Sequence, residues 1–221
     1  PKELHRVEEG ASLIDYSLRH IRQAGEAIDS VTLTIVPGKE AVADYVRSVL
    51  PGVEVRTCMF NPAYSEWPGS ILSSEALFAG RNVVLLPDSV ITMRSGEALF
   101  NCYRQAFETG SEAVFAYKPV SPTDPVTALG ALRVENGAVS DFCDKPDIAV
   151  APGYNAFWTS FGFTGSAGPK LLAMMMRSVA RERVDIAALG ARDEGCAYAF
   201  SDTGSFRAAV DQGLVEMDAP L

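Results

Sequence analysis

The sequence predicts a single α/β domain built on a mixed sheet. Over the first 118 residues, runs of β-branched and apolar residues alternate with amphipathic helical segments, the pattern of parallel strands joined by helices. In the second half, Asn136-Gly137 lies between two apolar runs and predicts a β-hairpin. A length of 221 residues with 48% hydrophobic residues suits one large domain.

The expected elements follow in chain order. In the first half, helical spacing covers residues 12–25, 38–50, 69–79 and 95–109, and strand-like runs cover 31–36, 53–59, 82–86 and 113–117. Gly25 is the expected stop of the first helix and Ser95 the expected N-cap of the fourth. In the second half, strands are expected at 126–134, 138–143, 157–164 and 197–200, and helices at 169–180, 184–189 and 205–212. Met174, Met175, Met176, Trp158 and Phe161 are expected in the core.

Composition excludes several functional classes. With 19 basic and 28 acidic side chains the net charge is −9, which argues against a nucleic-acid binder. The longest uninterrupted apolar run, residues 171–176, is far shorter than the roughly 20 residues of a membrane helix. No secretory leader opens the sequence, so we expect a cytoplasmic protein. Four dispersed cysteines and two histidines disfavour a disulfide scaffold, a zinc site and histidine-based nucleophilic catalysis.

Two aspartates follow expected strands. Asp88 comes directly after the strand at 82–86, and ligands of open α/β sheets gather at the carboxyl ends of strands. A carboxylate there would suit Mg²⁺, although a turn or capping role explains Asp88 equally simply. Asp202 lies in Ser201-Asp202-Thr203-Gly204, which taken alone is a good turn sequence.

Three further positions admit a binding role beside a structural one. Lys145 follows the hairpin in Asp144-Lys145-Pro146, where it would suit a phosphate or be a solvated loop residue. Gly69, in Trp67-Pro68-Gly69-Ser70, would let a flat base approach the backbone or simply begin a helix. Asn155 is either a turn residue or a ligand contact.

Six short motifs, taken in order, resemble the sugar-1-phosphate nucleotidyltransferases, also called nucleotide-sugar pyrophosphorylases. The strand ending in Pro87-Asp88 is similar to that of UTP–glucose-1-phosphate uridylyltransferases, and glucose-1-phosphate thymidylyltransferases are also close in pattern. The matching segments are Pro1-Lys2-Glu3-Leu4, residues 83–88, the strand 128–132 around Gly130, Asp144-Lys145-Pro146, residues 150–155, and Asp202-Thr203-Gly204.

The resemblance implies a fold and a reaction. The fold would be Rossmann-like, of the GT-A type, with a mixed, mostly parallel sheet flanked by helices and a small β-hairpin region for the acceptor. Residues 1–118 would form the nucleotide-binding half and residues 119–221 the sugar-phosphate-binding half of one domain. The reaction would join an NTP, with UTP or dTTP favoured, to a sugar 1-phosphate, giving an NDP-sugar and pyrophosphate with Mg²⁺ as cofactor. A homo-oligomer is compatible with the resemblance.

The resemblance also assigns residues. Lys2, Asp88 and Lys145 would be catalytic, with Lys2 on the triphosphate side and Lys145 on the sugar phosphate. The remaining assignments are Gly69, Ser70 and Pro87 for the nucleotide, Gly130, Asp144, Lys145 and Asn155 for the sugar phosphate, and Asp88 and Asp202 for the metal.

Two departures from the family pattern leave alternatives open. The family's first strand and Gly-rich phosphate loop precede the Pro1-Lys2 element and are absent from this sequence, and Asp144 replaces a glutamate. We expect this segment to lie upstream of Pro1, because loss of a buried central strand would expose its apolar neighbours and open new sheet edges. A catalytically inactive nucleotide-sugar-binding or regulatory homologue is one alternative. A second is a cytidylyltransferase for a phosphorylated alcohol such as phosphocholine, suggested by residues 61–64. A glycosyltransferase of related fold is less favoured, because residues 87–89 lack an Asp-x-Asp motif.

Overall fold

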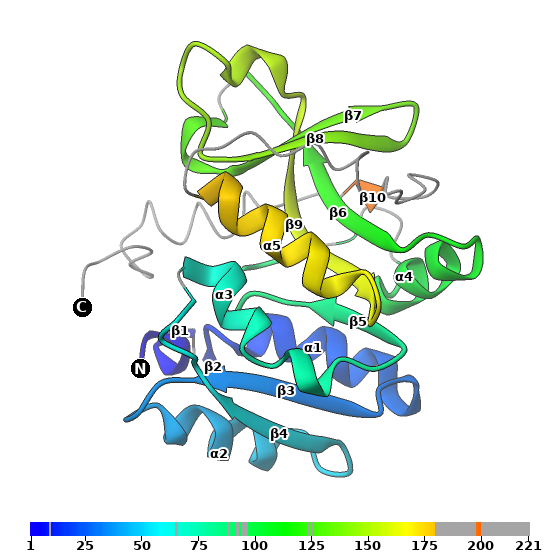
Figure 1. Ribbon diagram of the computed structural model, residues 1–221. Helices are drawn as coiled ribbons and strands as arrows, with labels where there is room; N and C mark the ends of the chain where they lie inside the picture. Colours follow the sequence, from blue (N-terminus) through cyan, green and yellow to red (C-terminus); the bar gives the residue numbers. More distant parts are fainter. Residues whose placement is uncertain are drawn as a thin grey trace.

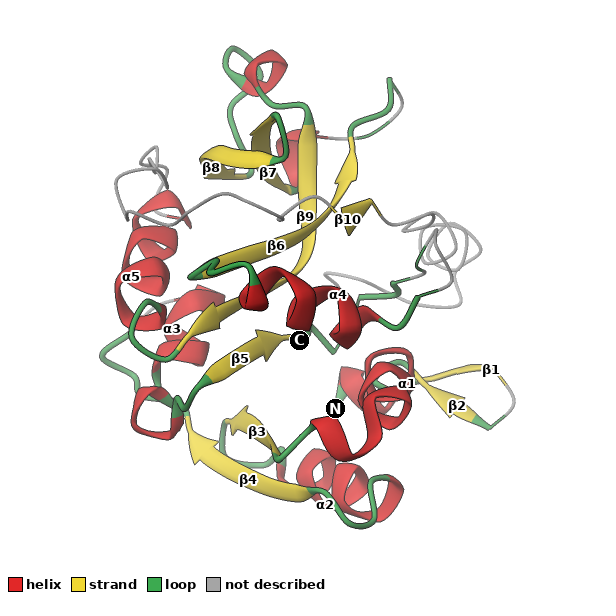
Figure 2. Ribbon diagram, turned by 90° about the vertical axis from the view of Figure 1, so that its right-hand side faces the viewer, coloured by secondary structure: helices red, strands yellow, loops and turns green. Residues whose placement is uncertain are grey.

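A computed structural model describes residues 1–8, 10–64, 66–87, 89–91, 93, 97–122, 124, 126–179 and 198–199. Strands form a central layer between two layers of helices (Figure 1). Viewed from the side, α3 and α5 lie on one face of the strands and α1 and α4 on the other (Figure 2). The α/β class expected from the sequence is confirmed.

The first half contains the expected alternation of strands and helices. Its elements are β1 (Arg6–Glu8), β2 (Ala11–Ser12), α1 (Asp15–Ala24), β3 (Ser30–Ile35), α2 (Glu40–Val49), β4 (Glu54–Met59), α3 (Glu66–Leu72), β5 (Arg81–Val84), α4 (Leu99–Glu108) and β6 (Ala113–Pro119). Short 3₁₀ turns cover Lys2–Leu4, Gly25–Ala27 and Glu75–Leu77. The small β1–β2 pair was not expected from the sequence.

The second half contains the expected hairpin and a long strand. Its elements are β7 (Gly130–Glu135), β8 (Ala138–Asp144), β9 (Ala156–Thr164), α5 (Gly168–Val179) and β10 (Tyr198–Ala199), with 3₁₀ turns at Val126–Ala128 and Ala151–Gly153. Asn136 (φ 53°) and Gly137 (φ 81°) both adopt left-handed backbone, as a two-residue hairpin turn requires. The expected helices at 184–189 and 205–212 lie outside the described residues.

Several boundaries differ from the expected ones. The chain at 126–128 makes a 3₁₀ turn, so the first hairpin strand begins only at Gly130. Helix α4 begins at Leu99 after the extended residue Ala98, and Ser95 lies outside the described residues. Helix α1 ends as predicted, because Gly25 takes a positive φ of 54°.

Strand β9 organises the main sheet. Along one edge it pairs antiparallel with β6, and along the other it pairs antiparallel with β5 near its end and with β7 near its start. The parallel pairs among the described strands are β3–β4 and β10–β6. The sheet is therefore mixed, as predicted, but the expected predominance of parallel pairs is not found among the described strands, because β9 separates β5 from β6.

The core lies where β9 and β6 pack against the helices. Eight of the nine residues of β9 are buried, and Met175 of α5 and Phe161 of β9 are fully enclosed. The predicted core roles of Met174, Met175, Trp158 and Phe161 are confirmed, whereas Met176 is only partly buried and packs against the same cluster. A second cluster joins α1 and α2 to β3. No helix among the described residues is long and apolar enough to cross a bilayer.

Candidate functional site

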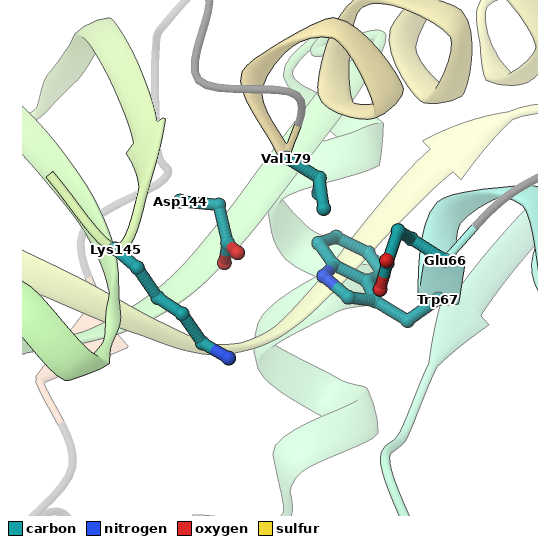
Figure 3. A pocket seen from close by; sticks show the side chains of 5 residues that line it. All are labelled: Glu66, Trp67, Asp144, Lys145 and Val179. Carbon is teal, nitrogen blue, oxygen red and sulfur yellow. The ribbon is translucent and has the colours of Figure 1, made fainter.

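A cavity of about 250 Å³ lies between α3, the end of β8 and the end of α5. Its lining residues are Glu66, Trp67, Asp144, Lys145 and Val179. In Figure 3 the side chains of Asp144 and Lys145 enter from one side, and those of Glu66 and Trp67 face them from the other. The cavity therefore joins the two halves of the chain and contains the predicted residues Asp144 and Lys145.

The hairpin and α5 hold Asp144 and Lys145 in place. Asp144 ends β8 opposite Gly130, and its backbone N–H donates to Ser178 Oγ of α5 at 2.8 Å. The N–H of Lys145 donates to the carbonyl of Leu129 at 3.0 Å. Lys145 adopts a φ of 50°, a left-handed conformation that is unfavourable for a residue other than glycine. The contact with α5 on one side and the contact with Leu129 on the other therefore fix the point at which Lys145 leaves the sheet.

Glu66 and Trp67 form the opposite wall. Glu66 begins α3 and also has left-handed backbone, with a φ of 57°. The ring of Trp67 packs against Trp158 (centroids 4.9 Å apart) and Phe161 (6.0 Å) of β9. Two strained non-glycine residues facing one cavity are typical of a functional site, because surrounding structure must maintain such conformations.

The described lining of the cavity contains two acidic side chains and one basic side chain. Burial raises the pKa of Asp144 above its ordinary value, the charge of Glu66 acts in the same direction, and Lys145 opposes both. Lys145 is exposed and forms no ion pair with any of the described residues. Lys145 therefore remains available for an anion.

Gly130 makes room for a tryptophan. A Cβ atom at this position would lie 1.9 Å from Nε1 of Trp158, far inside the closest contact that real Cβ atoms make. This indole nitrogen is buried and has no hydrogen-bond partner among the described residues. Because Trp158 supports Trp67, the missing side chain at Gly130 indirectly sets the aromatic wall of the cavity.

The predicted nucleotide residues Gly69 and Ser70 lie within α3 and do not line the cavity. A Cβ at Gly69 would meet Cβ of Tyr64 at 2.6 Å, so close packing alone explains the glycine. The expected helix at 69–79 is shorter and begins earlier, at Glu66. A role for these two residues in nucleotide binding stays a prediction.

Asn155 does not line the cavity. Its side chain pairs with the backbone of β7: Nδ2 donates to the carbonyl of Val134, and Oδ1 accepts from the N–H of Val134, both at 2.8 Å. The structure thus favours the structural alternative at this position over a direct sugar contact.

Lys2 and Pro87 lie outside the cavity as well. Lys2 is exposed on a 3₁₀ turn. The neighbouring Glu3 holds this turn in place, because its Oε1 accepts a hydrogen bond from Lys39 Nζ at 2.7 Å. Although burial alone would raise the pKa of Glu3, the hydrogen bond and charge of Lys39 hold it below its ordinary value. Asp88 and Asp202 lie outside the described residues, among which no cluster of three metal-ligating side chains occurs.

Helix α1 fixes both sides of the segment that contains Pro87. Ser17 Oγ donates to the carbonyl of Leu86 at 2.7 Å, and Arg19 Nη2 donates to the carbonyl of Ile91 at 2.8 Å. The same carbonyl lies 3.1 Å from Nε2 of the buried His20. Since a carbonyl only accepts, Nε2 carries the proton and the neutral ring leaves Nδ1 bare, without a partner among the described residues.

His20 should make folding stability depend on pH. Burial, with the charge of Arg19, lowers the pKa of His20 despite the opposing bond to Ile91. Below about pH 6.5 the unfolded chain therefore binds a proton that the folded chain does not, and the free energy of unfolding falls. Urea unfolding between pH 7.5 and 5 should show a smaller decrease for His20→Gln than for the wild type. His5→Gln is the control and should keep the wild-type decrease; equal decreases in all three would refute this role.

Sequence reasoning missed three lining residues: Glu66, Trp67 and Val179. Trp67 lies in the segment 67–70, where the sequence analysis selected Gly69. A tryptophan next to Pro68 at the start of a helix is a signal from which Trp67 could also have been predicted. An isolated glutamate such as Glu66 carries no such signal.

Known structures with this fold were found by structural comparison, whereas no family sequence model and no curated protein sequence matches the chain. An apo UDP-glucose pyrophosphorylase superposes with a TM-score of 0.69 at 16% identity, covering 96% of this chain and 90% of that one. UTP-bound UGPase from Acinetobacter baumannii gives 0.65 at 16% identity, covering 96% and 85%. The inositol-1-phosphate CTP transferase from T. maritima gives 0.63 at 14% identity, covering 100% and 89%. The chain has the fold of the sugar-1-phosphate nucleotidyltransferases, as its motifs predicted.

Proposed function

We propose that this protein transfers a nucleotidyl group from an NTP to a phosphorylated acceptor and releases pyrophosphate. The observation that carries this proposal is the cavity itself, in which the Asp144-Lys145 motif meets Glu66 and Trp67 from the other half of the chain. The structures of similar fold include a UTP-bound enzyme and a complex with UDP-glucose, which supports a nucleotide substrate.

In the proposed reaction an oxygen of the acceptor phosphate attacks the α-phosphorus of the NTP. A new P–O bond forms as the bond from the α-phosphorus to the bridging oxygen breaks, and pyrophosphate leaves with that electron pair. No proton transfer is required, so the protein acts by positioning and by neutralising charge. Lys145 would bind the acceptor phosphate, and Lys2 would lie on the triphosphate side.

The remaining assignments also belong to this proposal. Residues 1–118 would serve the nucleotide and residues 119–221 the acceptor, with a sugar 1-phosphate as acceptor and UTP or dTTP as donor. Asp88 and Asp202 offer the carboxylate oxygens that Mg²⁺ prefers, and the bound cation would neutralise charge on the phosphates. Gly69, Ser70 and Pro87 would border the nucleotide, and Gly130 and Asp144 the acceptor.

We further propose that an additional extended segment completes the sheet between β3 and β5. Among the described strands, β3 pairs only with β4 and β5 only with β9, so each has an edge available. No residue of β5 is buried and only Ile35 of β3 is, in contrast to the buried β9. Leu85, just after β5, nevertheless packs against the hydrophobic cluster of α1 and α2 that residues of β3 also contact. A strand there would cover these apolar residues and bring a phosphate-binding loop to the site.

Pyrophosphate release tests the proposed function. The protein, expressed with any residues encoded upstream of Pro1, should release pyrophosphate in the presence of Mg²⁺ with at least one pair from a panel of NTPs and acceptor phosphates. Binding of a nucleotide and an acceptor by calorimetry, without release from any pair, would instead identify the inactive binding homologue. No binding of any panel member would refute both.

A further inference from the structure

We propose that the acceptor carries a cationic ammonium group in addition to its phosphate. This inference rests on the proposed function and specifies the substrate class of the same cavity. Among the described residues, the cavity is lined by two carboxylates, Glu66 and Asp144, and by a single cation, Lys145. A ligand that is complementary to this lining has one anionic and one cationic end.

The charge balance favours such a ligand over a purely anionic one. Once a phosphate pairs with Lys145, none of the described lining residues offers a second cation for Glu66 and Asp144, and like charges would surround the acceptor. Glu66 forms no ion pair with any described residue, so its carboxylate is available. An ammonium group between the two carboxylates would relieve their repulsion, whereas a hydroxyl would leave the net charge unchanged.

A fixed aromatic side chain forms one wall of the cavity beside the carboxylates. Trp67 lines the cavity beside Glu66, and Figure 3 shows its indole with the nitrogen end directed toward the Asp144 and Lys145 side chains. Contacts with Trp158 and Phe161 hold the ring, so it is positioned before any ligand arrives. A cation is attracted to the face of an aromatic ring and not to its N–H edge, so the ammonium proposal rests on the two carboxylates, and Trp67 supplies a rigid wall beside them.

Glu66 adopts an unfavourable backbone conformation. A φ of 57° is unfavourable for a residue other than glycine, and such conformations cluster at active sites and ligand-binding segments. Pro68 and Gly69, which follow in the first turn of α3, are buried. Glu66 therefore lines the cavity from the first residue of α3, although the residue itself is exposed.

Calorimetry with two matched pairs of ligands tests the proposal. Glucosamine 1-phosphate is compared with glucose 1-phosphate, and phosphocholine with 3,3-dimethylbutyl phosphate, its uncharged isostere. In at least one pair the ammonium ligand should bind about tenfold more tightly than its neutral partner. Glu66→Gln should reduce this ratio to about two or less, because the ammonium group loses one of its two carboxylate partners.

Glu75→Gln is the matched control, because Glu75 is exposed on the turn after α3 and does not line the cavity. It removes the same charge and should keep the wild-type ratio. Equal affinities within both pairs would overturn the ammonium proposal and leave nucleotidyl transfer standing. Absence of binding for every acceptor and every NTP would overturn the proposed function, and the ammonium proposal with it.

Discussion

Lys145→Ala should weaken binding of the acceptor phosphate by about 10- to 100-fold, with a change of no more than about twofold for the NTP. A charge-assisted hydrogen bond contributes about 1.5–3 kcal/mol, and each 1.4 kcal/mol is a factor of ten in affinity. Lys145 supplies the only cationic side chain among the residues that line the described cavity, so no neighbour there would replace it. Calorimetric titration of both substrates measures the two affinities.

The control for Lys145 is Lys170→Ala on α5, which removes the same charge from an exposed position outside the cavity. It should leave both affinities unchanged within about twofold. Equal losses for the acceptor and the NTP in Lys145→Ala would contradict the role proposed for this residue. An unchanged acceptor affinity would remove Lys145 from the binding site.

Gly130→Ala should destabilise the protein by about 1–3 kcal/mol, the usual cost of overfilling a packed region. The added Cβ would lie 1.9 Å from Nε1 of Trp158 and 2.6 Å from its Cδ1, so the ring must move. Trp158 has little freedom, since it packs on Trp67 and Phe161. Urea unfolding measures the loss of stability, and calorimetry should show weaker acceptor binding as the aromatic wall shifts.

Gly165→Ala is the matched control, because a Cβ there meets its nearest atoms at 3.5 Å, an ordinary contact. It should change stability by less than about 0.5 kcal/mol. Introducing Gly130→Ala into a Trp158→Phe background should cost less than in the wild type, because the smaller ring lacks the clashing edge. Equal costs in the two backgrounds would show that Trp158 is not the reason for the glycine.

The sequence predicted the local elements better than their pairing. Asn136-Gly137 determines its hairpin through two residues that tolerate positive φ, and Gly25 ends α1 for the same reason. The antiparallel insertion of β9 between β5 and β6 was not predictable, because it depends on pairs such as Arg81 with Thr164, which are far apart in the sequence. A buried strand shows the same apolar run whether its neighbours are parallel or antiparallel.

The sequence predicted those lining residues of the cavity that are adjacent in one motif. It did not predict the lining residues that reach the cavity only through tertiary contacts. Asp144 and Lys145 are adjacent in sequence and lie in the cavity. Glu66 and Trp67 reach it only because α3 packs beside the end of α5, which no local pattern reports. Asn155 illustrates the converse: a residue type suited to ligands is used instead to bind Val134. The metal roles of Asp88 and Asp202 stay predictions.

Magnesium-dependent pyrophosphate release tests nucleotidyl transfer most directly. We predict release with one NTP and one acceptor phosphate, with the ammonium-bearing acceptors preferred. Asp88→Asn, which replaces a carboxylate by a neutral amide, should abolish this release without lowering the cooperativity of unfolding. Release at the wild-type rate in Asp88→Asn would remove that residue from the site. No release from any pair, by the protein with its upstream residues present, would contradict nucleotidyl transfer.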